Sequence, residues 1–319
     1  MHVFRGLPTA ESRTPCALAI GNFDGVHRGH RALLERVVDA ARTRGLPAAV
    51  MTFEPHPREF FAARAGDPTQ APARISNLRD KLEALRDCGI DRVIVEHFNE
   101  RFAALTPEAF VERVLVEGCH ARWICVGDDF RYGVRRGGDF ASLRAAGAQH
   151  GFEVEAMPTI VHDQERISSS GVRRALGAGD FAHAAQLLGR PYMISGRVVH
   201  GRKLGRTIGF PTLNLRVAHK RPAMTGVFAV RVHGLAGDGA VLTGAASLGV
   251  RPTIEDTGNV LLETFVFDWA GDAYGKLVRI EFVAKLRDEK KYPSLDALTA
   301  AIEADARDAR AALARSAAF

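Results

Sequence analysis

Two histidines three residues apart, His27 and His30, belong to the stretch 21–30, whose sequence is GNFDGVHRGH. The stretch follows an apolar run at 17–20 and precedes a helical pattern with apolar residues on one face. A histidine pair at a helix start can stabilise negative charge on a transferring phosphoryl group, and free backbone N–H groups there bind phosphate. An isolated pair of this kind is more often a turn with a capping histidine. The glycines, Asp24 and the strand–turn–helix setting favour a phosphate site here.

Three further polar clusters follow predicted strands in the first half of the chain. They are TFEPHP at 52–57, VGDDFRYG at 126–133, and SSS at 168–170 with Arg173. The carboxyl ends of parallel strands lie at one edge of a sheet, where nucleotides bind. The serine hydroxyls and Arg173 can hold phosphate oxygens there. Each cluster alone is as readily a rigid loop, a solvated turn or an N-cap, so the prediction depends on their joint occurrence.

The densest motif of the second half, residues 196–214, reads GRVVHGRKLGRTIGFPTLN. Its glycines let the backbone approach a polyphosphate closely, and Lys203 and Arg206 can bind phosphates. Thr212 can ligate Mg²⁺ and Asn214 can hold an ATP oxygen, although a plain hairpin with a glycine-rich turn fits equally well. Neither G-x-x-x-x-G-K-[ST] nor G-x-G-x-x-G occurs in the chain. The sequence therefore lacks the motifs that identify a P-loop kinase or a dinucleotide-dependent dehydrogenase.

The two halves of the chain show different sequence patterns, and these patterns predict the elements that position the motifs. In the first half, predicted strands alternate with helices, which indicates a doubly wound parallel sheet. Beyond about residue 190 short strands separated by glycine turns indicate a small antiparallel barrel of five or six strands. A helix beginning at Ser294 is expected to pack on the barrel through Leu295, Leu298 and Ile302. The predicted strands of the second half are 193–199, 227–232, 242–248, 261–267 and 277–283.

Composition sets the broad class. The 319 residues suffice for two domains, and 25% charged with 46% hydrophobic residues is ordinary for a globular protein. The net charge of +6 is compatible with polyphosphate substrates, and the dispersed arginines argue against a nucleic-acid tail. Four cysteines without C-x-x-C spacing make zinc and a disulfide framework improbable. Without an apolar run of ~20 residues or a signal-peptide pattern, we expect a cytoplasmic protein without membrane spans.

The motifs carry a family resemblance. The decapeptide 21–30 resembles the H-x-G-H signature of the nucleotidyltransferase superfamily, in the form found in bacterial bifunctional riboflavin kinase/FAD synthetases. The clusters at 52–57, 126–133 and 168–173 are similar to the family's adenylyltransferase motifs, in the same order. Residues 196–214 closely resemble the riboflavin kinase signature, with later matches at 225–229, 249–253 and 262–265. Small departures at Tyr132, Phe228 and Ala273 affect only local packing.

The resemblance implies two domains, an α/β doubly wound, Rossmann-like nucleotidyltransferase over 1–185 and an antiparallel six-stranded β-barrel plus helix over 186–319. The first would join the AMP part of ATP to FMN, giving FAD and pyrophosphate. The residues implied at the ATP phosphates are Gly21, Asn22, Phe23, Asp24, His27, His30, Ser169 and Arg173. Those implied on the FMN side are Phe53, Pro55, His56 and Asp129.

The second domain would convert riboflavin to FMN with ATP and Mg²⁺. By the resemblance Glu263 is the general base and Thr212 the metal ligand. The residues implied at ATP are Gly201, Lys203, Gly205, Arg206, Thr212 and Asn214, and those on the flavin side are Arg251, Thr253 and Glu263.

Two other functions fit parts of the sequence. The same α/β fold can adenylylate a different phosphate or phospho-sugar. A basic barrel can also be a nucleic-acid module, which predicts salt-dependent binding and aromatics on an open sheet face. The glycine-rich loop suits phosphate better than stacked bases, so we expect small-molecule partners and no nucleic acid. The oligomeric state stays open, and free release of FMN between two separate sites is the default expectation.

Overall fold

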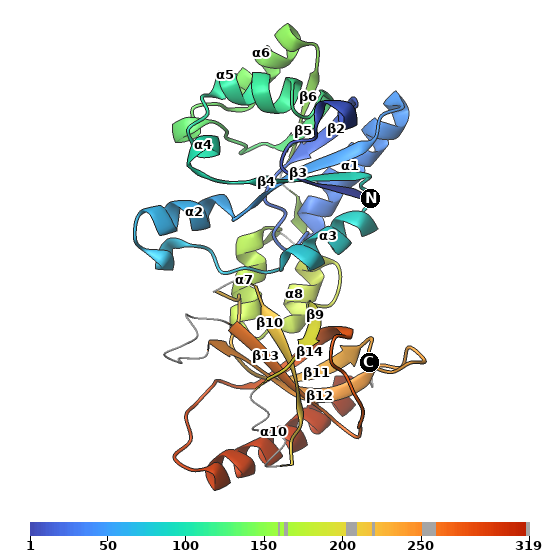
Figure 1. The fold of residues 1–319 in the computed structure, drawn as a ribbon, viewed down its shortest axis with the longest axis vertical. Helices are drawn as coiled ribbons and strands as arrows, with labels where there is room; N and C mark the ends of the chain where they lie inside the picture. The colour runs from blue at the N-terminus through green and yellow to red at the C-terminus, as the bar shows by residue number, and fades with distance from the viewer. Residues whose placement is uncertain (159, 163–164, 202–208, 219–220, 251–259, 317–319) are drawn as a thin grey trace. The chain divides into compact units, whose positions relative to one another are not determined.

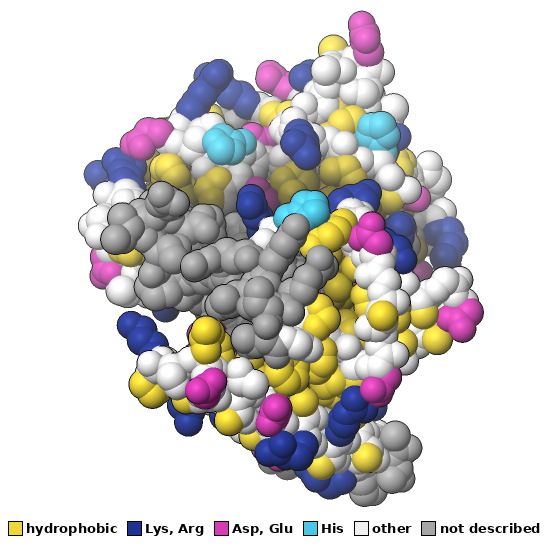
Figure 2. Space-filling model, turned by 60° about the horizontal axis from the view of Figure 1, so that its bottom comes forward, with side chains coloured by type: hydrophobic (Ala, Val, Ile, Leu, Met, Phe, Trp, Pro, Cys, Tyr) yellow, Lys and Arg dark blue, Asp and Glu magenta, His cyan; other side chains and the backbone are white. Residues whose placement is uncertain are grey.

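The computed structural model describes residues 1–158, 160–162, 165–201, 209–218, 221–250 and 260–316 (Figure 1). The chain divides into two compact units: Met1–Pro72 with Lys81–Ser168, and Ala73–Asp80 with the chain from Ser169 onward. The sequence-based boundary at 185/186 stays a prediction. No helix in the described ranges is long and apolar enough to cross a membrane. Lys and Arg side chains are scattered over the face that Figure 2 shows.

The first unit contains a six-stranded parallel sheet in the order β1-β4-β3-β2-β5-β6. The direction of strand succession reverses at β2, and ligands of doubly wound sheets bind at the carboxyl end of such a reversal. The doubly wound α/β prediction is confirmed. The edge strand β1 was not expected, because the first fifteen residues carry no apolar run. The strands are β1 (His2–Arg5), β2 (Cys16–Ile20), β3 (Ala48–Glu54), β4 (Arg92–His97), β5 (Ala121–Gly127) and β6 (Glu153–Met157).

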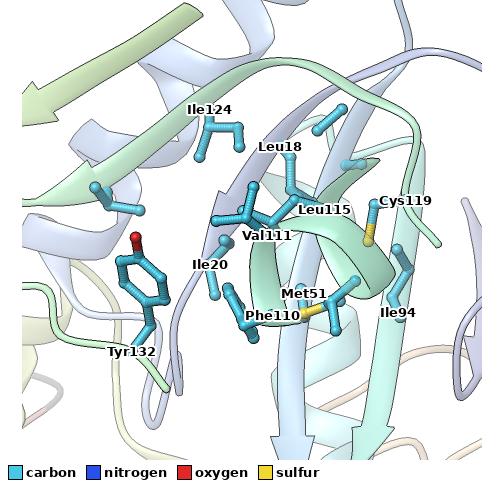
Figure 3. Close-up of a cluster of buried hydrophobic side chains, with 14 of the residues drawn as sticks. Leu18, Ile20, Met51, Ile94, Phe110, Val111, Leu115, Cys119, Ile124 and Tyr132 are labelled. Atoms are coloured by element: carbon cyan, nitrogen blue, oxygen red, sulfur yellow. The ribbon is translucent and has the colours of Figure 1, made fainter. Parts of the chain in front are cut away.

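Helices cover this sheet and close its core. All five residues of β2 are buried, as expected for a central parallel strand covered on both faces. Figure 3 shows side chains of the strands lying against a helical segment that carries Phe110 and Leu115. In this segment α5 continues into a π-helical turn, Val111–Val116. The helices are α1 (Arg28–Arg44), α2 (Pro57–Arg64), α3 (Leu78–Asp87), α4 (Glu100–Ala103), α5 (Pro107–Phe110) and α6 (Phe140–His150).

The second unit contains a closed antiparallel barrel in the order β10-β13-β12-β11-β14-β9. The predicted six-stranded barrel is confirmed, and one of its strands, β10, begins inside the motif that the sequence placed in a loop. Its residues alternate polar and apolar side chains, but the glycines and the proline that precede it favoured a loop. The strands are β9 (Met193–Val199), β10 (Thr212–Val217), β11 (Gly226–His233), β12 (Leu242–Val250), β13 (Val260–Val266) and β14 (Leu277–Arg287).

Helices α7 (Ser169–Ala178) and α8 (Phe181–Leu188) precede the barrel, and α10 (Leu295–Ser316) follows it. The predicted C-terminal helix is confirmed, but its expected contact face is wrong at Leu295, which is 55% exposed. The apolar contact lies further along, where Ala309, Ala312 and Leu313 pack against the barrel. Small residues let the helix approach the sheet closely, and a search for large apolar residues overlooks them.

Candidate active sites

The histidine pair lies at the start of α1, directly after β2. His27 is the N-cap residue: its Nδ1 accepts the backbone N–H of His30 at 3.3 Å. The two imidazole rings are stacked, with centroids 3.7 Å apart. Because Nδ1 accepts a hydrogen bond, the proton of the neutral His27 ring is on Nε2. The histidine thus caps the helix through Nδ1 and carries its proton on Nε2.

The loop that leads into this helix has an unusual backbone. Phe23, Gly25 and Val26 have φ angles of 46°, 86° and 41°, in the left-handed region. Phe23 and Val26 are nevertheless buried, at 1% and 0% exposure. A β-branched residue rarely adopts such an angle, and strain of this kind concentrates at functional sites. The fold therefore holds this loop in one conformation at the carboxyl end of β2.

The cluster after β3 is partly structural. His56 caps α2: its Nδ1 accepts the N–H of Arg58, and its own N–H donates to Glu59 Oε2, both at 3.1 Å. Phe53 is buried, with its ring edge-on to that of Phe98 at 5.8 Å. These contacts make a rigid wall beside the switch point. A role for Phe53 and His56 on the FMN side stays a prediction.

The cluster after β5 flanks the same switch point. Asp129 is largely exposed and forms an ion pair with Arg166 at 3.2 Å. The ring of Tyr132 stacks on Phe130, with centroids 5.7 Å apart, and burial raises the pKa of the Tyr132 hydroxyl. Tyr132 is therefore part of a buried aromatic cluster.

The two remaining adenylyltransferase residues, Ser169 and Arg173, lie on α7, which belongs to the second unit. Arg173 Nε donates to the carbonyl of Ala73, also in that unit, at 2.6 Å. The position of both residues relative to the histidine pair stays a prediction.

In the barrel, polar residues from three strands form one row. Asn214 on β10 lies directly opposite Glu263 on β13, which lies directly opposite Ser247 on β12. Directly opposed residues have Cβ atoms about 4.5–5.5 Å apart. In β13 the neighbours of Glu263 are buried while Glu263 is not, so the row lies on the outer face of the barrel. Thr212, two residues before Asn214, shares that face.

The amide of Asn214 has an unsatisfied acceptor. The residue is 5% exposed, and its Nδ2 donates to the Thr212 carbonyl at 3.1 Å. Its Oδ1 is buried and has no hydrogen-bond partner among the residues that the structure describes. A buried acceptor without a partner is unfavourable, so this oxygen is suited to a ligand donor or a cation. Mg²⁺ prefers oxygen ligands, and the Thr212 hydroxyl and Asn214 Oδ1 are of that type.

Gly201 faces this amide. A Cβ atom at Gly201 would lie 2.5 Å from Asn214 Nδ2. We expect Gly201→Ala to displace the Asn214 side chain and lower kcat/KM of phosphoryl transfer by the barrel about 10–100-fold, because misplaced groups lose reactivity steeply. Gly237 is the matched control, since a Cβ there meets nothing within 4 Å. An unchanged rate in Gly201→Ala, measured with varied ATP, would contradict a role for this amide.

Sequence reasoning missed a second carboxylate beside the row. Ser247 Oγ donates to Glu289 Oε1 at 3.1 Å, and the Glu289 carboxylate lies where a side chain at Gly249 would stand. Burial raises the pKa of Glu289, and the nearby Glu263 carboxylate raises it further against the Ser247 hydrogen bond. Glu289 belongs to the charged run RDEKK at 287–291, which is typical of a solvated surface. The segment that follows β14 brings it to Ser247, which lies opposite Glu263.

Five expected kinase residues lie outside the described residues: Lys203, Gly205, Arg206, Arg251 and Thr253. Their roles stay predictions. The described part of the chain contains no group of three or more His, Cys, Asp and Glu side chains that could hold a metal ion.

Together these features define a two-domain enzyme of phosphoryl and nucleotidyl transfer. Residues 9–171 match the family model of FAD synthetase, and residues 188–313 match that of riboflavin kinase. A bifunctional riboflavin kinase/FMN adenylyltransferase from Pseudomonas fluorescens is 45% identical over 99% of both chains. One from Escherichia coli (strain K12) is 45% identical over 97% of both chains. The chain belongs to the family of bifunctional riboflavin kinase/FMN adenylyltransferases, as its motifs indicated.

A solved structure extends the likeness to the fold of the whole chain. A crystal structure of a protein from Streptococcus pneumoniae, named a macrolide-efflux protein, matches with a TM-score of 0.72 and 29% identity. The match covers 95% of this chain and 96% of that one. Both chains therefore share the order of a parallel α/β unit followed by a barrel unit.

Proposed function

We propose that the chain makes FAD from riboflavin in two ATP-dependent steps. The barrel unit phosphorylates riboflavin to FMN, and the α/β unit joins FMN to the AMP part of ATP. Support comes from family membership over nearly the full length of the chain. The observation that carries the second step is the stacked His27–His30 pair at the switch point of the sheet.

In the adenylyl transfer, a phosphate oxygen of FMN attacks the α-phosphorus of ATP while the bond to pyrophosphate breaks. Negative charge develops on the phosphate oxygens, and the Nε2–H of His27, the His30 ring and the N-terminus of α1 stabilise it. No side chain forms a covalent bond. Gly21, Asn22, Phe23 and Asp24 lie beside the triphosphate, Ser169 and Arg173 complete its site, and Phe53, Pro55, His56 and Asp129 line the FMN side.

In the phosphoryl transfer, the ribityl 5′-hydroxyl of riboflavin attacks the γ-phosphorus of ATP and ADP leaves. Glu263 accepts the proton of that hydroxyl. The Thr212 hydroxyl would hold Mg²⁺, which would neutralise charge on the triphosphate, and Asn214 would hold an ATP oxygen. The phosphate-binding residues are Gly201, Lys203, Gly205 and Arg206, and the flavin side is formed by Arg251 and Thr253.

We also propose a cytoplasmic location without nucleic-acid partners. Cys16, Cys88, Cys119 and Cys125 are all free thiols. Burial raises the pKa of Cys16 and of Cys125 to about 12, so both are protonated near neutral pH. Free thiols fit a reducing compartment. The described Lys and Arg side chains on the face in Figure 2 are scattered among other side chains.

The test is a product assay with the purified chain, MgATP and riboflavin, in which FMN and FAD are resolved over time. We expect FMN first and FAD later. FMN without FAD would contradict the adenylyltransferase assignment of the histidine pair. Untouched flavin together with salt-dependent binding of RNA or DNA would contradict both activities and favour a nucleic-acid module.

A further inference from the structure

The first 202 residues contain a single lysine, Lys81, while every other Lys or Arg position there is arginine. Lys81 lies on α3 and is 1% exposed, which makes it the most deeply buried ammonium that the structure describes. A buried cation is unfavourable unless it is paired. Its position beside the adenylyl-transfer site, in a half of the chain that otherwise uses arginine, therefore requires an explanation.

The ammonium is held at the carboxyl end of β3. Lys81 Nζ donates to Glu54 Oε1 at 3.0 Å and to Thr52 Oγ1 at 3.4 Å. Thr52 is fully buried, and Glu54 is the last residue of β3. A compact ammonium fits this enclosed site, whereas the planar guanidinium of arginine is larger and has a fixed fork of donors. This difference accounts for a lysine at position 81.

The same hydroxyl reaches the loop that precedes the histidine pair. Thr52 Oγ1 donates to the backbone carbonyl of Asn22 at 3.1 Å. The contact chain therefore runs from Lys81 Nζ through Thr52 Oγ1 to Asn22, the second residue of the stretch 21–26. That stretch contains the left-handed residues Phe23 and Val26. A strained loop persists only where surrounding contacts over-determine it.

We propose that Lys81 is a positioning residue of the adenylyl-transfer site: through Thr52 it holds the Asn22 carbonyl, and thereby the strained loop that places His27 and His30. The inference rests on the proposed role of the histidine pair. The charge of Lys81 orients the Thr52 hydroxyl by taking one of its lone pairs, so its proton points to the Asn22 carbonyl. Loss of either contact lets the loop relax and moves the donors away from the α-phosphate.

The experiment uses the full chain and separates this role from simple charge pairing. Thr52→Val removes the hydroxyl but leaves the Lys81–Glu54 pair, whereas Lys81→Met combined with Glu54→Gln removes the pair without leaving a lone charge. We expect kcat for conversion of FMN to FAD to fall about 10–100-fold in both, with KM for FMN little changed. Thr52→Ser, which keeps a hydroxyl, is expected to recover most of the rate.

Two controls accompany these variants. Thr43→Val removes a hydroxyl that also donates to a backbone carbonyl, that of Asp39, on the exposed side of α1, and is expected to leave the rate unchanged. Conversion of riboflavin to FMN by the same preparations reports on global folding and is expected to stay within about two-fold, since a loss confined to one step marks a local effect. Wild-type kcat in Thr52→Val would overturn the proposal.

A second readout does not depend on activity. Amide hydrogen exchange of residues 21–26 is expected to become faster in Thr52→Val and in the Lys81→Met/Glu54→Gln pair, but not in Thr43→Val. Unchanged exchange in this loop would overturn the proposal even if the rates fall. If the wild-type chain makes no FAD, the proposed function fails, and the exchange result still decides whether Lys81 holds the loop.

Discussion

Glu263→Gln is expected to abolish conversion of riboflavin to FMN while conversion of supplied FMN to FAD continues at the wild-type rate. The amide matches the carboxylate in shape but cannot accept the hydroxyl proton. A positioned general base contributes about 10²–10⁴-fold, so a loss of that size in kcat is expected with little change in KM for ATP. Glu263 lies on the outer face of β13 opposite Asn214, where a substrate can reach it.

The neighbouring carboxylate provides the sharpest comparison. Glu289 accepts a hydrogen bond from Ser247 at one end of the row, and burial raises its pKa. A raised pKa is also a property of many catalytic bases. Glu289→Gln removes the same charge next to the same site. We expect it to keep most of the kinase rate, because Glu289 is already engaged by Ser247. A large loss in Glu289→Gln with activity retained in Glu263→Gln would reverse the assignment of the base.

Predicting the two units from sequence worked where periodicity is strong. The buried run at 17–20 lies within β2, and the glycine-separated apolar runs beyond residue 190 give five of the six barrel strands. The strand β10 was missed although its polar and apolar residues alternate, because the glycines before it and Pro211 made the stretch look like a loop. Local pattern also says nothing about which strands pair, and the order of the sheet followed only from the structure.

In the candidate sites, too, some contacts were predictable from the sequence and others are known only from the structure. His27 and His30 are three residues apart in the chain, so their proximity was predictable from helix geometry. Glu263, Ser247 and Glu289 are brought together by register between β12 and β13 and by the path of the chain after β14, for which a single sequence holds no signal. Lys81 could have been noticed as a lone lysine among arginines. Its partners Thr52 and Glu54 are known only from packing.

Substitution of His27 is expected to stop FAD synthesis, and the structure shows how to separate its two roles. His27 caps α1, so His27→Ala loses both the cap and the Nε2–H donor, and loss of a cap destabilises by about 1 kcal/mol. His27→Asn keeps an acceptor for the His30 N–H and removes only the imidazole. We expect both variants to lower kcat for adenylylation about 10²–10³-fold, the effect of removing one charge-stabilising donor, while the Asn variant keeps wild-type thermal stability.

The riboflavin kinase activity of the same chain is the control for this comparison. Conversion of riboflavin to FMN by the same samples should be unaffected, and His150→Ala, at the far end of α6, should leave both reactions unchanged. His30→Ala should reproduce the loss, since its ring stacks on that of His27 at 3.7 Å. If His27→Asn synthesised FAD at the wild-type rate, the imidazole would be only a helix cap, and the charge on the α-phosphate would have to be stabilised by the backbone of α1 and its neighbours.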